Sequence, residues 1–218
     1  MTTVKPATGN ARSARIVAVF GATGTGKSIW TIQQVRKPKR NRLVIWSPKE
    51  AQDGHAVTFN APAVDTVREA YAVMSRADTT SPFRLVFRPS INRKTAVKQF
   101  DAICAAVLKL GNITLVVEEL HTVTQPSWAP DQWSALVLMG RAAGVEIFAL
   151  SQRPASVDKD LFSNVSMIHA GRVSYEDDAK VLGRVLLVPP SELLVLPDLH
   201  FIERTTSPNE TRRGVVKP

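Results

Sequence analysis

Two groups of polar residues in this sequence could act together on a phosphate ester. The stretch 21–28, GATGTGKS, matches the pattern G-x-x-x-x-G-K-S, in which backbone N–H groups surround phosphate oxygens. Further along the chain, the apolar run ITLVVEEL ends in two adjacent carboxylates, Glu118 and Glu119. A phosphate-binding loop and a pair of acids are the residue types that hydrolysis of a nucleoside triphosphate needs.

The loop residues are expected to hold the nucleotide in different ways. Because glycine tolerates backbone angles that other residues avoid, the glycines let the chain curl with its N–H groups inward. We expect Lys27 to reach the β- and γ-phosphates of ATP and the Ser28 hydroxyl to hold Mg²⁺. A turn without a ligand is disfavoured, because a strand pattern precedes the loop and a helical pattern follows it. The predicted nucleotide-binding residues are Gly21, Ala22, Thr23, Gly24, Thr25, Gly26, Lys27 and Ser28.

The paired acids are expected to have separate roles. Two carboxylates at the end of a buried strand are costly unless they are solvated, bound to metal or catalytic. We expect Glu118 to help hold Mg²⁺, with a side chain one methylene longer than the usual Asp. Glu119 then polarises the attacking water as general base. The alternative is a pair of acids at a solvated strand end.

Further polar residues follow in VEIFALSQRP and its surroundings. Gln152, at a strand end, could contact both the attacking water and the γ-phosphate; the alternative is a cap of a loop or helix. Arg141 could stabilise transition-state charge on a neighbouring subunit, and Arg172 is the second candidate. Each arginine could equally form a surface ion pair. His121 could orient Glu119, although a single loop histidine is more often a plain polar residue.

The elements that position these residues form an alternating pattern. Such alternation predicts an α/β fold with a mostly parallel central sheet and helices on both faces. Ligands of such sheets bind where the strands end. We expect one ATPase domain over 14–206, with flexible tails at 1–13 and 207–218. The predicted strands are 14–20, 42–48, 83–89, 113–120, 145–151, 166–173 and 199–205, and the helices 27–37, 63–77, 94–111, 130–144 and 175–186.

Composition narrows the setting. The 218 residues carry 28 Lys and Arg against 19 Asp and Glu, a formal net charge of +9. This excess favours a polyanionic partner, nucleic acid first, unless the basic surface is inert. The single cysteine, Cys104, lies in an apolar run and is expected to be a buried core residue in a reducing compartment. No run is apolar enough for a membrane span or a signal peptide, so a soluble protein is expected.

The order of these motifs resembles the HerA–FtsK superfamily of DNA-pumping ATPases. The resemblance runs from the phosphate loop through the two acids, GR, SQRP and HAGRVSYEDD to about residue 183. Because the chain is small, it looks like the genome-packaging ATPases of tailless icosahedral viruses with an internal membrane. The resemblance implies a RecA-like P-loop NTPase core, ATP hydrolysis with Mg²⁺, and a ring, hexameric in that family, around double-stranded DNA. It also implies Glu119 as base, Gln152 as sensor and Arg141 as the preferred arginine acting in trans.

The resemblance also implies partners and a location. Arg93 and Lys94 in SINRK, and Lys159, follow strand ends and could contact DNA phosphates, unless they are solvated surface charges. A capsid vertex or a membrane-associated viral protein is a further possible partner. The expected location is the host cytoplasm, the virion or both.

Other functions stay open at this point. A plasmid or phage DNA-transfer ATPase of the same superfamily would be expected to have a membrane anchor or partner domain. A small-molecule kinase with a phosphate loop would need an arginine-rich lid, and would need neither the paired acids nor SQRP. A GTPase is weaker still, because VDKD at 157–160 lacks the Asn of the guanine-reading motif.

Overall fold

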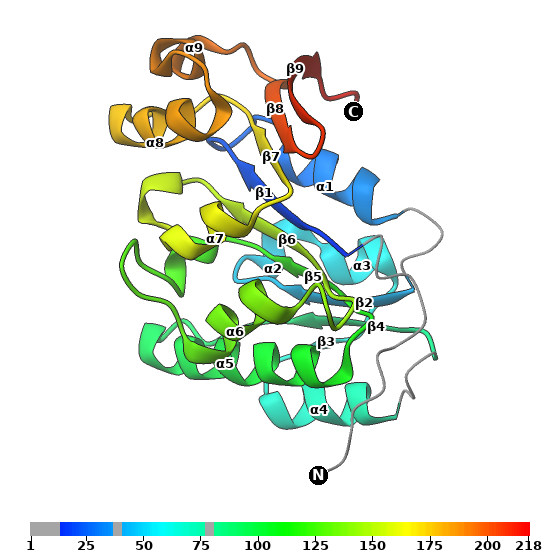
Figure 1. Ribbon diagram of the computed structural model, residues 1–218. Helices are drawn as coiled ribbons and strands as arrows, with labels where there is room; N and C mark the ends of the chain where they lie inside the picture. Colours follow the sequence, from blue (N-terminus) through cyan, green and yellow to red (C-terminus); the bar gives the residue numbers. More distant parts are fainter. Residues whose placement is uncertain (1–13, 37–40, 77–80) are drawn as a thin grey trace.

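The sheet at the centre of the fold contains nine strands (Figure 1). Residues 14–36, 41–76 and 81–218 are those that the computed structural model describes. The strands are β1 (Ile16–Phe20), β2 (Arg42–Trp46), β3 (Ala63–Val64), β4 (Phe83–Phe87), β5 (Thr114–Val117), β6 (Glu146–Ser151), β7 (Met167–Ala170), β8 (His200–Thr206) and β9 (Asn209–Val215). Their order is β3-β4-β2-β5-β6-β1-β7-β8-β9, and only the pairs β7–β8 and β8–β9 are antiparallel. The predicted α/β class with a mostly parallel sheet is therefore confirmed.

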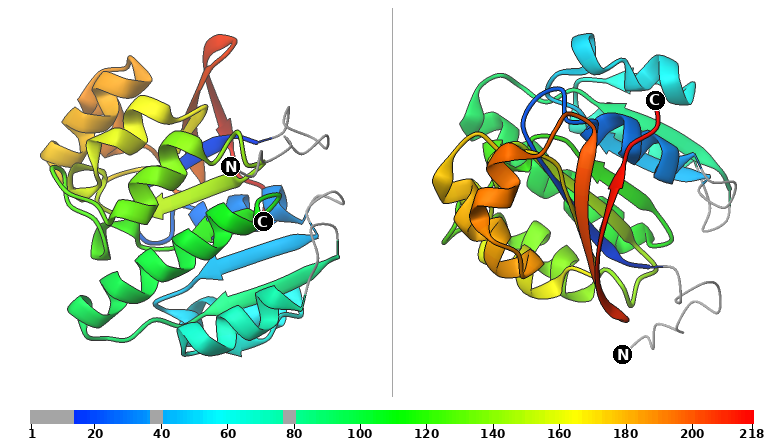
Figure 2. Two further views of the ribbon diagram at one scale, coloured as in Figure 1. Left: turned by 60° about the horizontal axis from the view of Figure 1, so that its bottom comes forward. Right: turned by 90° about the horizontal axis from the view of Figure 1, so that it is seen from above.

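Helices cover both faces of this sheet (Figures 1 and 2). Helices α4 to α9 pack on one face, where their apolar residues meet one side of every central strand. Helices α1 and α3 pack on the other face. The helices are α1 (Lys27–Val35), α2 (Glu50–Asp53), α3 (His55–Phe59), α4 (Val67–Ser75), α5 (Arg93–Leu110), α6 (Asp131–Met139), α7 (Lys159–Asn164), α8 (Glu176–Leu186) and α9 (Pro190–Val195).

The strand β1 shows why the apolar runs become buried parallel strands. Alternate residues of a strand point to opposite faces. Ile16, Ala18 and Phe20 enter the core beneath α4 to α9, whereas Val17 and Val19 enter the core beneath α1. Because helices cover both faces, the strand is apolar throughout and not alternating. This continuous pattern made the central strands readable from the sequence.

The predicted mobile tail at 207–218 is wrong. Residues 209–215 form β9, which pairs with β8 along its whole length. The side chain of Val216 is buried, with 2% exposure. The sequence NETRRGV gives no apolar pattern because an edge strand with an exposed face is held mainly by its backbone hydrogen bonds. The other predicted tail, 1–13, lies outside the described residues.

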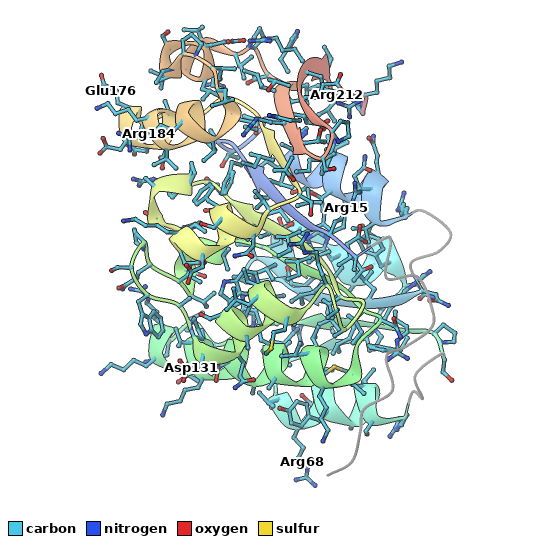
Figure 3. The ribbon with its side chains drawn as sticks, in the orientation of Figure 1. Arg15, Arg68, Asp131, Glu176, Arg184 and Arg212 are labelled. Atoms are coloured by element: carbon cyan, nitrogen blue, oxygen red, sulfur yellow. The ribbon has the colours of Figure 1, made fainter. Side chains whose placement is uncertain are left out.

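A chain of polar side chains, of which His169 and Glu203 are buried, connects this C-terminal hairpin to the interior. His169 Nδ1 lies 2.8 Å from Glu203 Oε1, and Arg212 Nε donates to Glu203 Oε2 at 2.6 Å. Arg212 lies on the β9 hairpin (Figure 3). The ring of Trp30, from α1, stacks on His169 with centroids 4.2 Å apart. Strands β7, β8 and β9 are thus joined through side chains to the helix that follows the phosphate loop.

Several short elements are absent from the sequence prediction. These are β3 and the helices α2, α3, α7 and α9, each six residues or shorter. Elements of this length hold fewer than two helical turns, so no hydrophobic period can reveal them. Charged side chains such as Arg68, Asp131 and Glu176 extend from the outer surfaces of the longer helices (Figure 3). Within the described ranges, no helix combines the length and apolarity needed to cross a bilayer.

Candidate active site

The predicted phosphate loop connects β1 to α1 and has the expected shape. Gly24 and Gly26 adopt φ angles of 82° and 89°, in the left-handed region that favours glycine. Gly26 is the N-cap of α1, and it provides no side-chain cap; the first turn of the helix contains no acid. The positive end of the helix dipole therefore faces a cavity of about 290 Å³ beside the loop.

Lys27 lies folded back over the loop. Its ammonium group donates to the carbonyl oxygens of Gly21 at 2.7 Å and Ala22 at 2.8 Å. Burial lowers the pKa of Lys27, although Glu119 and Glu118 partly oppose this effect. The sequence prediction placed Lys27 on the β- and γ-phosphates; the position at the cavity fits that role.

The loop is braced from the neighbouring strand. Ala22 donates its N–H to the carbonyl oxygen of Arg172 at 2.7 Å, just after β7. Thr25 Oγ1 donates to the Ala22 carbonyl at 2.8 Å. A Cβ at Gly21 would lie 2.6 Å from Thr25 Oγ1, too close for any other residue. The loop conformation is therefore fixed by packing as well as by its glycines.

The two acids follow β5 and enter the same cavity as the loop. Both are buried, with Glu118 6% and Glu119 7% exposed. Glu119 adopts a left-handed conformation, with φ 50°, which is uncommon outside glycine and is found more often at functional sites. This turn directs the two side chains differently, although they are adjacent in the sequence.

Glu119 lies at the centre of a polar network. Gln152 Nε2 donates to Glu119 Oε1 at 2.6 Å, and the Lys49 ammonium pairs with the same oxygen. His121 Nδ1 lies 3.5 Å from Oε2 but forms its hydrogen bond with Ser151 Oγ, at 3.0 Å. Burial would raise the pKa of Glu119, yet the hydrogen bond and charge of Lys49, with smaller effects of His121 and Gln152, lower the pKa overall. Glu119 is therefore held as a carboxylate, the form that a general base requires.

Gln152 connects this carboxylate to the phosphate loop. Its Oε1 accepts a hydrogen bond from Thr23 Oγ1 at 3.2 Å, while its Nε2 donates to Glu119. The strands β1 and β6 are neighbours in the sheet, with Phe20 opposite Ser151, so their ends bring the loop and Gln152 together. The sequence prediction of a sensor role for Gln152 stays a prediction, but its position is the one that the role needs.

Glu118 has a different set of neighbours. His55 Nε2 lies 3.2 Å from Glu118 Oε1. Burial would lower the pKa of His55, but the hydrogen bond and charge of Glu118 raise it overall. Asp53 lines the same cavity, and burial followed by repulsion from Glu118 raises the pKa of its carboxyl. Glu118 and Ser28 both line this cavity, as the predicted pair of metal ligands should.

Sequence reasoning missed Lys49 and His55. Both follow β2, in the segment 47–60, which contains two short helices and no recognisable motif. The available signal was topological, because a lysine just after a parallel strand lies at the edge of the sheet where ligands bind. The unpredicted position of β2 beside β5 is what brings Lys49 to Glu119.

The structure separates the predicted arginines and basic residues. Arg172 lies beside the phosphate loop, with its guanidinium 2.7 Å from Asp198. Arg141 is exposed in the turn before β6, at the opposite end of that strand from Gln152. Arg93 begins α5 and donates to the Thr122 carbonyl at 3.1 Å, while Lys94 and Lys159 are exposed.

The C-terminal segment covers the phosphate loop. A Cβ at Gly26 would lie 3.0 Å from Leu199 Cδ2 and 3.4 Å from the Val216 Cβ. Gln33, in α1, donates to the Lys217 carbonyl at 2.6 Å. Val216 and Lys217, which the sequence predicted to lie in a tail, therefore pack against the phosphate loop and α1.

We predict that Val216→Asp weakens ATP binding by about tenfold or more, because it places a carboxylate beside the phosphate-binding loop. Val215→Asp is the matched control, since Val215 is 52% exposed whereas Val216 is 2% exposed. Affinity for a fluorescent ATP analogue measures the difference, and circular dichroism confirms that both variants fold. Equal affinity in two folded variants would contradict a role for the segment.

Comparisons with known proteins agree with this architecture. No family model matches the chain. Protein P9 of Pseudoalteromonas phage PM2 is 24% identical over 160 residues, which are 72% of this chain and 67% of P9. The genome packaging NTPase B204 from Sulfolobus turreted icosahedral virus 2, solved with ATP-gammaS, superposes with a TM-score of 0.68, 12% identity, and coverage of 94% of this chain and 98% of B204.

A third similar protein is VirB4 of Thermoanaerobacter pseudethanolicus. It superposes with a TM-score of 0.68 and 9% identity, over 96% of this chain and 91% of that one. At such identities the solved structures establish the fold alone. The superpositions confirm the fold expected from the motifs, and P9 is a phage protein whose sequence is similar over 72% of this chain.

Proposed function

We propose that this chain is an ATP-driven double-stranded DNA translocase, the motor that packages a viral genome into a preformed capsid. The observation that carries the ATPase assignment is Gln152, which hydrogen-bonds to Thr23 of the phosphate loop and to Glu119 at once. A nucleotide-binding loop and a buried carboxylate are thereby joined through one amide.

The residues at the cavity fit ATP with its metal ion. The N-terminus of α1 faces the cavity without a side-chain cap, so its amides suit phosphate oxygens. No three His, Cys, Asp or Glu side chains in the described parts of the chain cluster as a metal site. Ser28 and Glu118, which both line the cavity, would hold Mg²⁺, and the ion would neutralise charge that develops on the phosphates.

Each of the side chains at the cavity then has a separate role in ATP hydrolysis. Glu119 orients water and accepts its proton, and its lowered pKa keeps it ionised at neutral pH. Lys27 compensates negative charge on the phosphates. Gln152 links the conformation of the phosphate loop to the position of Glu119 through its two hydrogen bonds. We assign Arg141 to the nucleotide of a neighbouring subunit, since its place at the opposite end of β6 from Gln152 argues against a role in its own cavity. Arg172 pairs with Asp198 and is the second choice.

The similar proteins support this setting. B204 is a viral genome packaging NTPase with the same fold, and P9 belongs to a phage. The proposal therefore includes a homo-oligomeric ring, hexameric as the resemblance implies, on double-stranded DNA. It also includes a capsid vertex or membrane-associated viral protein as partner, and the host cytoplasm or virion as location. The similarity to VirB4 keeps a DNA-transfer ATPase as the second candidate.

ATP hydrolysis measured with and without double-stranded DNA tests this proposal, together with the mass of the protein in ATP. We expect DNA to raise the rate of ATP hydrolysis, because a translocase couples hydrolysis to movement along DNA. We also expect the measured mass to be that of a ring. A monomer whose ATPase rate ignores DNA would contradict the proposal and favour a small-molecule kinase.

A further inference from the structure

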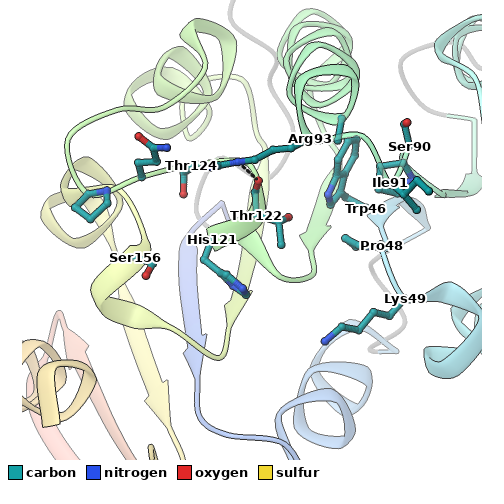
Figure 4. Close-up of a pocket in the computed structure, with 14 residues that line it drawn as sticks. Trp46, Pro48, Lys49, Ser90, Ile91, Arg93, His121, Thr122, Thr124 and Ser156 are labelled. Atoms are coloured by element: carbon teal, nitrogen blue, oxygen red, sulfur yellow. Dashed lines mark hydrogen bonds between the residues drawn. The ribbon is translucent and has the colours of Figure 1, made fainter. Parts of the chain in front are cut away.

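A second, larger cavity lies beside the nucleotide cavity, at the same edge of the sheet (Figure 4). Its volume is about 680 Å³, within the usual range for ligand sites. The loops after β2, β4 and β5 form its walls. Trp46, Pro48, Pro89, Ile91 and Pro126 give it an apolar surface.

The charges of this cavity have one sign. Lys49 and Arg93 line it, and the described residues of its lining include no Asp or Glu. Arg93 extends over the cavity and donates to the Thr122 carbonyl at 3.1 Å, so its remaining guanidinium N–H groups are available to a ligand (Figure 4). A cavity of this composition suits an anion that also carries apolar surface.

One cation is common to both cavities. Lys49 lines the nucleotide cavity and the larger one, and its ammonium pairs with Glu119. The Lys49 side chain is 46% exposed, so a ligand in either cavity can reach its ammonium group. His121 lines the larger cavity and also lies 3.5 Å from Glu119. An anion in the larger cavity therefore lies one residue away from the general base.

We propose that this cavity binds the sugar–phosphate backbone of the translocated DNA. The proposal rests on the function proposed above and names the surface that contacts the DNA. Arg93 and Lys49 pair with backbone phosphates, and the prolines and Ile91 pack against deoxyribose. Ile91 is fully exposed at the rim, in a position to meet a long polymer and not only a small anion.

The charge at Arg93 can be tested by the salt dependence of DNA binding. Each phosphate contact contributes about 0.9 to the slope of log K against log salt for duplex DNA. Arg93→Ala is expected to lower the magnitude of that slope by about 0.9 for duplexes of any sequence. Lys98→Ala is the matched control, because it removes one exposed charge from the same helix, outside the cavity.

A second pair of variants tests the rim without risk to folding. Ile91→Glu places a carboxylate at the cavity and should weaken duplex binding by about tenfold or more. Val57→Glu, at an 89% exposed position on α3, adds the same charge elsewhere and should change affinity by less than about threefold.

The outcomes separate this proposal from the proposed function. If the unaltered protein binds duplex DNA but Arg93→Ala behaves as Lys98→Ala, and Ile91→Glu as Val57→Glu, the DNA site lies elsewhere and the cavity assignment is overturned. If the unaltered protein binds no duplex DNA with ATP present, the translocase assignment fails and the cavity assignment fails with it. Selective loss in both cavity variants supports the site.

Discussion

Glu119→Gln abolishes most ATP turnover while ATP still binds. Gln has nearly the same shape but cannot accept the proton of the attacking water, and loss of a general base costs about 10²- to 10⁴-fold in rate. Gln152 can turn its amide to keep a hydrogen bond with the new side chain, so the cavity should stay intact. The measurement is steady-state phosphate release beside equilibrium binding of an ATP analogue.

Glu176→Gln is the control for this result. Glu176 is an exposed acid at the start of α8 and is not among the residues that line the nucleotide cavity, so the same chemical change should leave hydrolysis within about twofold. Hydrolysis by Glu119→Gln at the unaltered rate would show that another group accepts the proton. Loss of ATP binding would instead show that Glu119 shapes the cavity.

Arg141→Ala abolishes hydrolysis, and mixing it with Lys27→Ala restores part of the activity. An arginine that stabilises transition-state charge contributes about 10³- to 10⁵-fold in rate. Arg141 and Gln152 lie beyond opposite ends of β6, whose six residues extend roughly 20 Å. Arg141 therefore cannot reach the cavity of its own subunit, whereas a Lys27→Ala subunit can still supply Arg141 to a neighbour.

The mixing experiment measures phosphate release over a range of ratios of the two proteins. Arg184→Ala, another exposed arginine, serves as the control and should keep the unaltered rate. Recovery that peaks near equal amounts is the expected signature of a site shared between subunits. If no ratio restores activity, although mass measurements show mixed rings, Arg141 does not act in trans.

The central part of the site was predictable because its residues adjoin readable elements. The phosphate loop lies between an apolar strand and a helix, and both Glu118 and Gln152 directly follow buried strands. Each position could be inferred from its own stretch of sequence. Parallel strands then bring their ends to one edge, so proximity followed from the fold class.

Lys49 and the C-terminal wall were not predictable for the opposite reason. The contact of Lys49 with Glu119 depends on β2 pairing with β5, a choice of neighbours that no local pattern encodes. Val216 is buried because the pairing of β8 with β9 places it against Gly26 of the phosphate loop. Long-range pairing decides both contacts, and a polar edge strand resembles a mobile tail when read alone.

The position of Lys49 between two cavities has a thermodynamic consequence. A single ammonium cannot neutralise Glu119 and a ligand phosphate equally well, so occupancy of one cavity changes the free energy of the other. Such coupling is reciprocal: the factor by which DNA changes affinity for ATP is the factor by which ATP changes affinity for DNA. If the larger cavity binds DNA as proposed, Lys49 would couple DNA binding to ATP binding by exchanging Glu119 for a DNA phosphate as its partner.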